Sequence, residues 1–351
     1  MLELDVLIFD IDGVLIDVSE SYRKAIRQTP QIYLESIMGL SPCNRDLVSR
    51  EEVAALKLAG GFNNDWDATA VLVKYFLAQL DVQPGTPRPQ TAKEIIASIR
   101  QAGKHIHTSV ESLRRRKDIP AFAAALRAQG GGLAAARKIL GDRNDHLLAA
   151  DLVKRIFEEI YLGDELFARE YGEPPQVQHG DGLIRRESLI PDLHSLISLS
   201  HRVALGIATG RPRNEATYAL EVAGIAKYFR ALVAHEDIVA AEQAHFESTG
   251  QRVLLGKPHP FTLREAARRI TRERARCAYI GDTLDDVRAT NAAKAEMDFV
   301  SIACLAPAED KPAMRREFER IGADLIVERP DELVEMIQPR RHARCARIRG
   351  G

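Results

Sequence analysis

Cysteine is scarce in this sequence, and its few residues are far apart. The 351 residues include only four cysteines: Cys43, Cys277, Cys304 and Cys345. None stands in a C-x-x-C or Cys/His ligand spacing, which argues against a zinc site and against a disulfide framework. We therefore expect a protein of the reducing cytoplasm.

Long hydrophobic runs and an excess of charge of one sign are also missing. No segment approaches the roughly 18 apolar residues that span a bilayer, and the N-terminus carries acids where a secretory signal is basic. The net charge is −1 at pH 7, so no overall field attracts nucleic acid or an anionic membrane. We expect neither nucleic acid nor a membrane as a partner. Any affinity for an anion such as phosphate must come from a local group of residues.

Short apolar segments bounded by polar residues or glycine are present instead. Hydrophobic residues make up 45% of the chain, which is long enough for two domains. The apolar runs predict buried strands at 4–9, 203–208, 231–234, 277–280, 299–303 and 324–327. Helical patterns lie between them, as at 213–222 and 260–270, so we predict a Rossmann-like three-layer α/β core with a parallel sheet.

After the first strand, helical periodicity replaces the strand pattern. Amphipathic stretches occur at 92–102, 121–128 and 146–161. The last residues are rich in arginine and have little to pack, which predicts a basic, disordered tail. The predicted parts are an α/β core of residues 1–16 and 186–338, a large all-helical insert of residues 17–185, and a tail of residues 339–351.

Two carboxylates follow the first predicted strand. Asp10 and Asp12 stand two residues apart, where open α/β sheets bind ligands, at the carboxyl end of a strand. Gly13 allows the backbone to turn sharply and approach a ligand. A turn or helix cap explains many such pairs, so this motif needs support from others.

Two polar motifs follow later in the chain. Thr209 and Gly210 end the predicted strand 203–208 and offer a hydroxyl and backbone N–H groups to phosphate oxygens. Lys257 precedes Pro258 and offers an ammonium that can neutralise phosphoryl charge. An ordinary polar turn and a surface lysine are the alternatives when each motif is taken alone.

An acidic cluster follows the strand predicted at 277–280. It contains Asp282, Asp285 and Asp286, and hard carboxylate oxygens suit Mg²⁺. The alternative is a helix N-cap with extra acids that favour the helix dipole. The sequence therefore predicts either a metal site or a capped helix at this strand end.

Together the four motifs, in the order Asp, Thr, Lys, Asp, resemble those of the haloacid dehalogenase superfamily. The insert after the first motif is similar in position to the helical cap of its subfamily I phosphatases, which include phosphoglycolate phosphatase and β-phosphoglucomutase. The resemblance covers the core and extends only loosely to the insert, which at about 170 residues exceeds a small cap.

The resemblance implies a catalytic role for each carboxylate of the first motif. Asp10 would be the nucleophile and form an aspartyl-phosphate. Asp12 would be the general acid and base, and its presence distinguishes the chain from the dehalogenase branch. Val14 stands where many members of the family have threonine, and we expect no change of reaction from it.

The resemblance also implies the binding groups. Thr209, Gly210 and Lys257 would bind the phosphoryl group. The cofactor would be Mg²⁺, held by Asp282 with the Asp10 carboxylate and the Asp12 backbone carbonyl. Asp286 would complete or orient this metal site, with Asp285 as its neighbouring competitor.

One segment of the insert is a candidate for substrate specificity. Lys57, Asn63, Asn64 and Trp66 bring hydrogen-bonding groups together around the only tryptophan. The equally favoured alternative is a glycine-rich helix end followed by an Asn/Asp N-cap for a helix at 67–80.

The resemblance implies Mg²⁺-dependent hydrolysis of the phosphate monoester of a small metabolite. A phosphomutase of the same fold and a non-catalytic phosphate-binding module are the alternatives. Phosphoglycolate, a sugar phosphate, a nucleoside monophosphate and histidinol phosphate all fit, and the sequence leaves the substrate and the oligomeric state open.

Overall fold

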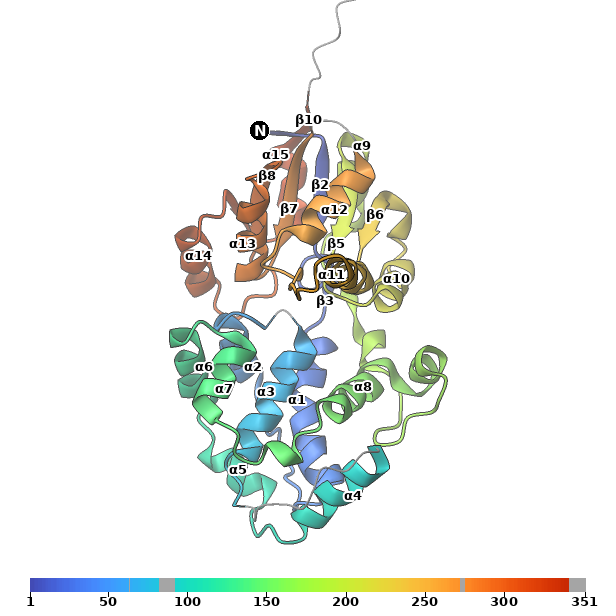
Figure 1. Ribbon diagram of the computed structural model, residues 1–351. Helices are drawn as coiled ribbons and strands as arrows, with labels where there is room; N and C mark the ends of the chain where they lie inside the picture. The colour runs from blue at the N-terminus through green and yellow to red at the C-terminus, as the bar shows by residue number, and fades with distance from the viewer. Residues whose placement is uncertain (63, 82–91, 272–274, 341–351) are drawn as a thin grey trace, which may run out of the picture. The chain divides into compact units, whose positions relative to one another are not determined.

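The computed structural model describes residues 1–62, 64–81, 92–271 and 275–340. The chain divides into two compact units, Met1–Asp17 with Leu189–Gly351, and Val18–Ser188. Figure 1 shows the helices and strands of each unit. The division falls close to the boundaries predicted at 16/17 and 185/186, and within the described ranges no helix is long and apolar enough to cross a membrane.

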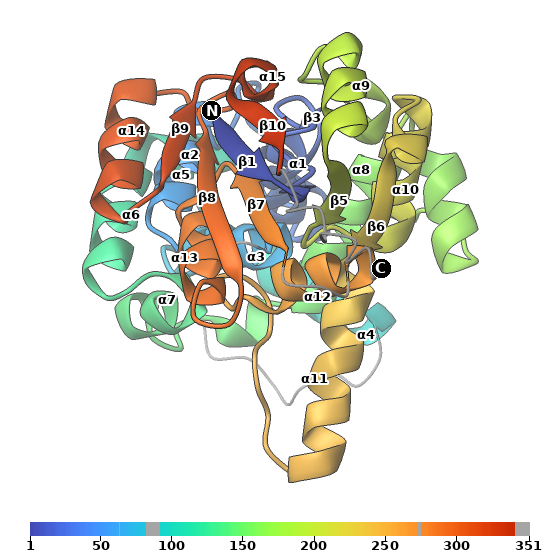
Figure 2. The ribbon, with the colours of Figure 1, turned by 90° about the horizontal axis from the view of Figure 1, so that it is seen from above.

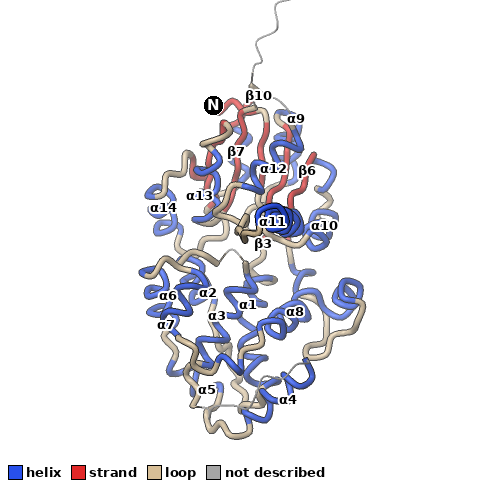
Figure 3. Tube along the Cα trace, in the orientation of Figure 1, coloured by secondary structure: helices blue, strands red, loops and turns tan. Residues whose placement is uncertain are grey.

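The first unit is built around a six-stranded parallel sheet with the order β6-β5-β2-β7-β8-β9. Its strands are β2 (Val6–Phe9), β5 (Ala204–Ala208), β6 (Phe229–Val233), β7 (Arg276–Gly281), β8 (Asp298–Cys304) and β9 (Leu325–Val327). They are the red tubes of Figure 3. The first of them in the chain, β2, therefore lies between β5 and β7.

Helices cover both faces of this sheet. The α-helices of this unit are α9 (Leu193–Arg202), α10 (Arg213–Val222), α11 (His235–Thr249), α12 (Phe261–Ile270), α13 (Leu284–Ala293), α14 (Lys311–Arg320) and α15 (Leu333–Met336). Of these, α11 projects away from the sheet in Figure 2. Figure 2 shows α9 and α15 on one side of the strands and α12 and α13 on the other. The predicted three-layer α/β core with a parallel sheet is confirmed.

The sheet of the first unit has an apolar core, and β2 is buried along its whole length. Ile8 of β2 and Tyr279 of β7 belong to one buried cluster with Leu263 and Ala266 of α12. A helix packs against a sheet through one apolar stripe, which α12 provides. This packing fixes the strand ends that carry the site.

Two short strands extend the first unit at its chain ends. β1 (Leu2–Leu4) pairs in parallel with β10 (Ile337–Pro339). The Arg340 backbone N–H also donates to the Leu4 carbonyl. Pro339 and Arg340, which the sequence assigns to the basic tail, thus contact β1, and residues 341–351 lie outside the described residues.

In the second unit, the described residues form mainly helices. They are α1 (Tyr22–Ile32), a π-helix (Tyr33–Ile37), α2 (Arg50–Leu58), α3 (Asp65–Leu77), α4 (Ala92–Gly103), α5 (Val110–Arg116), α6 (Ile119–Ala128), α7 (Gly132–Leu140) and α8 (Ala150–Tyr171). Near the boundary, β3 (Ile16–Asp17) and β4 (Ser188–Leu189) form a two-stranded sheet. The insert is therefore helical, as predicted.

Candidate active site

The predicted site residues of the core follow three adjacent strands. Asp10 follows β2, Thr209 follows β5 and Asp282 follows β7. The strands are in parallel register, with Phe9 opposite both Ile207 and Ile280. Since parallel strands end at the same edge of a sheet, the three motifs meet at that edge.

Lys257 joins the first and the last of these motifs. Its Nζ lies 2.8 Å from Asp10 Oδ2 and 2.7 Å from Asp286 Oδ1. It also donates to the Tyr279 hydroxyl at 2.6 Å. The three charged side chains are almost completely buried, so this ammonium offsets the repulsion between two carboxylates in a site of low polarity.

Burial and charge act in opposite directions on these groups. Burial is the largest effect on Asp10 and raises its pKa, although Lys257 opposes the shift. Burial also disfavours ionised Asp286, but Lys257 and hydrogen bonds from Thr283 outweigh it and lower the pKa. Burial disfavours charged Lys257, but Asp10 and Asp286 outweigh it and raise its pKa. The lysine therefore remains an ammonium at neutral pH.

Three carboxylates of the site can share a metal ion. One oxygen each from Asp10, Asp282 and Asp286 lies within 4.8 Å of the others. Gly13, at φ +75°, faces this group, since a Cβ there would lie 2.4 Å from Asp282 Oδ2. An all-oxygen donor set with a close backbone fits a hard cation such as Mg²⁺.

The competitor Asp285 lies outside this group of three carboxylates. It is buried, and its Oδ1 accepts a hydrogen bond of 2.8 Å from Arg288. Asp286 instead lies one helical turn after Asp282 and points to Lys257. The structure therefore favours Asp286 over Asp285 as the second acid of this motif.

Asp12 has a different partner from Asp10. Its Oδ1 lies 2.7 Å from Nη2 of Arg211, whose side chain is fully buried, while the Asp12 side chain is 30% exposed. A carboxylate at the solvent boundary can reach a leaving group, whereas Asp10 is held by Lys257 and by the Ile11 N–H. The two aspartates are thus in different environments, as different catalytic roles require.

The turn after β5 carries the two predicted phosphate-binding residues. Thr209 is buried, and its Oγ1 accepts a hydrogen bond of 3.2 Å from the Arg211 N–H. Gly210 is exposed, and a Cβ there would meet no atom within 4 Å. The open side of this turn is therefore the Gly210 backbone, and the Thr209 hydroxyl stabilises its shape.

The candidate specificity residues of the insert have partners within their own unit. Lys57 Nζ donates to the Phe62 carbonyl at 2.9 Å and pairs with Asp65. Asn64 caps α3 by accepting the Trp66 N–H at 2.9 Å. The predicted N-cap is thus confirmed, although the helix begins at Asp65 and ends at Leu77 rather than covering 67–80.

The tryptophan of this segment is also engaged. Trp66 Nε1 donates to Glu158 Oε1 at 2.6 Å, and Lys154 Nζ lies 3.6 Å from the ring centroid. Asn63 lies outside the described residues. A contact between this segment and a substrate stays a prediction.

Two residues of the site were not predicted from the sequence. Arg211 had no assigned role although it follows Thr209 and Gly210, and Tyr279 was predicted only as part of a strand. A signal for Tyr279 was available, because a tyrosine in a buried strand needs a partner for its hydroxyl.

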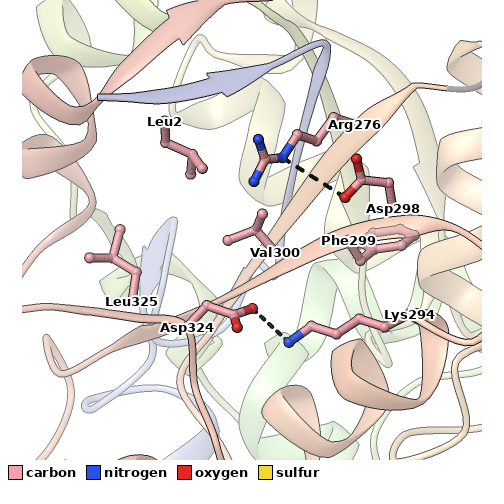
Figure 4. A pocket seen from close by; sticks show the side chains of 8 residues that line it. All are labelled: Leu2, Arg276, Lys294, Asp298, Phe299, Val300, Asp324 and Leu325. Atoms are coloured by element: carbon pink, nitrogen blue, oxygen red, sulfur yellow. Dashed lines mark ion pairs between the residues drawn. The ribbon is translucent and has the colours of Figure 1, made fainter.

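A hollow of about 470 Å³ lies where β7, β8 and β9 begin, away from the motif residues (Figure 4). Its charged side chains pair with one another. Arg276 faces Asp298 at 3.8 Å, and Lys294 contacts Asp324 at 2.7 Å. The hollow is thus at the starts of these strands, whereas Asp10, Thr209 and Asp282 follow the ends of theirs.

Solved structures of similar fold are known. A structural genomics target has a TM-score of 0.59 and 18% identity, over 95% of this chain and 98% of that chain. Phosphatase Tt82 from Thermococcus thioreducens has a TM-score of 0.49 and 24% identity, over 84% and 91% of the two chains. At such identities the first likeness shows the fold alone.

One curated relative matches a small part of the sequence. It is named imidazoleglycerol-phosphate dehydratase, from Phytophthora nicotianae, and is 42% identical over 67 residues, which are 19% of this chain and 12% of that protein. The match thus spans about an eighth of the length of that relative.

A family model gives the widest match. It is described as "Hydrolase: haloacid dehalogenase-like hydrolase" and covers residues 4–294. This range includes all four motifs and the strands that position them. The match agrees with an aspartate after the central strand, a lysine bound to it and a group of acids beside both that could hold a metal ion. The chain therefore belongs to the haloacid dehalogenase-like hydrolases.

Proposed function

We propose that this chain is a Mg²⁺-dependent phosphatase that hydrolyses the phosphate monoester of a small metabolite. The observation that carries the proposal is the placement of Lys257 between Asp10 and Asp286, within a group of carboxylates that can hold a metal ion. Phosphoryl transfer needs positioning and charge neutralisation above all. A nucleophile, an ammonium and acidic metal ligands at one strand edge provide both.

In the proposed reaction, Asp10 attacks the phosphorus atom and forms an aspartyl-phosphate. The bond between phosphorus and the leaving oxygen breaks, and Asp12 gives that oxygen a proton. Asp12 then accepts a proton from the water that attacks the phosphorus of the aspartyl-phosphate, and the bond between phosphorus and the Asp10 oxygen breaks. Asp10 is thereby regenerated as a carboxylate, and the products are an alcohol and inorganic phosphate. Burial of Asp10 limits access of water to the carboxylate.

Phosphate binding would involve Lys257, the Gly210 backbone and Thr209. Asp10, Asp282 and Asp286, with the Asp12 backbone carbonyl, would hold Mg²⁺, whose positive charge neutralises the phosphoryl oxygens. Lys257 adds an ammonium beside them, so positive charge faces the phosphoryl group from the protein itself.

The substrate is proposed only as a class. The core motifs recognise the phosphoryl group, and the partial match to a protein named imidazoleglycerol-phosphate dehydratase is a reason to include an imidazole-bearing ester. A suitable panel contains phosphoglycolate, sugar phosphates, nucleoside monophosphates and histidinol phosphate.

The test is phosphate release across this panel, with and without Mg²⁺, by the wild type and three variants. Asp10→Asn removes the nucleophile, and Asp286→Asn removes a carboxylate of the metal group. Asp285→Asn is the matched control. Asp285 is a buried carboxylate next to Asp286, but it contacts Arg288 and does not belong to the three acids of the metal group. We expect Mg²⁺-dependent release by the wild type and Asp285→Asn, and none by Asp10→Asn.

Each other outcome has a meaning. Turnover by Asp10→Asn at the wild-type rate would contradict the covalent mechanism. Equal losses in Asp286→Asn and Asp285→Asn would contradict the assignment of the metal group. Absence of phosphate release by the wild type would contradict the phosphatase function and favour a phosphomutase or a non-catalytic module.

A further inference from the structure

Tyr279 lies next to Lys257, one of the proposed site residues. It is in β7, its side chain is fully buried, and it packs in the cluster that joins β2 and β7 to α12. The centroid of its ring lies 5.2 Å from Lys257 Nζ. The ring is thus part of the core, while its hydroxyl reaches the site.

The hydroxyl of Tyr279 is one of the acceptors around the lysine. Lys257 Nζ donates to Asp10 Oδ2 at 2.8 Å, to Asp286 Oδ1 at 2.7 Å and to Tyr279 Oη at 2.6 Å. The contact with the hydroxyl is the shortest of these three, so Tyr279 helps to fix the position of the nitrogen.

The same hydroxyl is bound on its other side. It lies 3.1 Å from the Ala208 carbonyl and 3.2 Å from Asp286 Oδ1, and it can donate its single hydrogen to either. Ala208 is the last residue of β5, directly before Thr209. Tyr279 thus connects the lysine to the strand that carries the phosphate-binding turn.

The charge of the third acceptor also matters. Asp10 and Asp286 bring two negative charges to Lys257, whereas a phenol contributes an acceptor without a further charge. A third carboxylate here would add a negative charge, which the phosphoryl group would have to approach. A neutral hydroxyl positions the ammonium without adding negative charge. The positive charge of Lys257 can therefore interact with the phosphoryl group.

We propose that Tyr279 is a positioning residue that holds the Lys257 ammonium between the nucleophile Asp10 and Asp286. This inference rests on the proposed phosphatase function. Tyr279 acts through the lysine and does not contact the substrate. Without its hydroxyl, Lys257 loses the acceptor that lies 2.6 Å from Nζ, and the ammonium shifts relative to Asp10.

The variant that tests this role is Tyr279→Phe, which keeps the buried ring and removes the hydroxyl. The matched control is Tyr33→Phe in the second unit. Tyr33 is also fully buried, and its hydroxyl donates to the Leu147 carbonyl at 2.5 Å. The Tyr33 hydroxyl also accepts a hydrogen bond of 3.3 Å from the Ala149 N–H. Both variants therefore lose the hydrogen bonds that a buried hydroxyl donates and accepts, but only Tyr279→Phe affects Lys257.

We expect kcat of Tyr279→Phe to fall about tenfold or more, with KM within about twofold of the wild type. Tyr33→Phe should keep the wild-type kcat, and both variants should show a lower midpoint of urea unfolding. A purely structural role of Tyr279 would lower the unfolding midpoint and leave kcat unchanged, which would overturn the proposal.

A double-mutant cycle with Lys257→Met gives the second test. Because Tyr279 acts through the lysine, adding Tyr279→Phe to Lys257→Met should cause no further loss of kcat beyond about twofold. Independent, multiplying losses would overturn the proposal. If Lys257→Met fails to fold, the comparison of Tyr279→Phe with Tyr33→Phe still decides.

The assay also separates this inference from the proposed function. Wild type and Asp10→Asn are measured alongside. If the wild type shows no Asp10-dependent turnover, the phosphatase function fails and this inference fails with it. If the wild type is active and Tyr279→Phe retains its kcat, only the role of Tyr279 is refuted.

Discussion

Replacing Gly13 with alanine should weaken metal binding although Gly13 is not a ligand. Gly13 has φ +75°, and a Cβ on it would lie 2.4 Å from Asp282 Oδ2 and 2.9 Å from Pro307 Cγ. A carbon and an oxygen in contact are normally more than about 3 Å apart, so the Asp282 carboxylate must move by roughly 1 Å. Magnesium requires oxygen ligands at about 2.0–2.1 Å.

The expected loss has two parts. Alanine in the left-handed region costs about 1–2 kcal/mol of folding free energy. Displacement of Asp282 should weaken Mg²⁺ binding by about 10–100-fold, the range found when the groups that orient metal ligands are changed. Only the second part depends on the proximity of Gly13 to Asp282.

Gly224→Ala is the matched control for backbone strain. Gly224 is in the same unit and has φ +69°, but a Cβ there would meet no atom within 4 Å. Both variants should lose similar free energy of unfolding in urea. Only Gly13→Ala should show weaker Mg²⁺ binding by calorimetry and a higher Mg²⁺ concentration for half-maximal phosphate release.

Two results would refute this reasoning. If Gly13→Ala binds Mg²⁺ within about twofold of the wild type, Asp282 is either not a ligand or not displaced. If Gly224→Ala weakens Mg²⁺ binding to the same extent, backbone strain and not the contact with Asp282 is responsible.

Two further predictions concern proton transfer and alkaline stability. Asp12→Asn should lower kcat/KM about 100-fold or more for an alkyl phosphate. The loss should be much smaller for p-nitrophenyl phosphate, because its leaving group needs no proton. Equal losses on both substrates would exclude Asp12 as the acid. Burial raises the pKa of Cys277 and of Cys304 from 9.0 to about 12. Above pH 9 the unfolded chain therefore releases thiol protons that the folded chain retains. The free energy of unfolding falls as the pH rises, by about 1 kcal/mol per thiol between pH 8 and pH 10. Replacing both cysteines with alanine should reduce this fall in urea unfolding, and an unchanged pH dependence would contradict the assignment.

Three of the four core motifs could be predicted because each follows an apolar strand, whereas Lys257 lies in the loop between α11 and α12. The strand predicted at 277–280 corresponds to β7, and Asp282 and Asp286 follow it in the spacing that brings Asp286 to Lys257. The helix at 213–222 has the predicted bounds. Such elements can be predicted from local patterns, because an apolar run marks a buried strand and a repeat of about 3.6 residues marks a helix.

The partners within the site could not be predicted in this way. Arg211 and Asp12 are far apart in the sequence, as are Tyr279 and Lys257, and their contacts depend on the order of the strands. Side-chain alternation places Tyr279 on one of two faces, but only the packing of α12 shows that this face meets Lys257.

Helix continuity in the insert was also hard to predict. Pro30 lies inside α1, which continues directly into a π-helix, although proline normally ends a helix. Gly163 has φ +71° and ψ 178°, outside the helical region, so α8 consists of two helices that meet at a kink there. The first of them ends next to Gly163, close to residue 161 as predicted, whereas the proline in α1 does not end its helix.

The central place of β2 has a consequence for biosynthesis. Its partners β5 and β7 begin only at Ala204 and Arg276. At about 5–20 residues per second, a ribosome needs on the order of ten seconds or more to reach them after making β2. All of residues 18–188 emerge during that time, while the apolar segment Val6–Phe9 has neither strand neighbour. The nascent chain must therefore protect a hydrophobic strand throughout this delay. Asp10 can contact Lys257 only after both have been synthesised and the strands around β2 have formed.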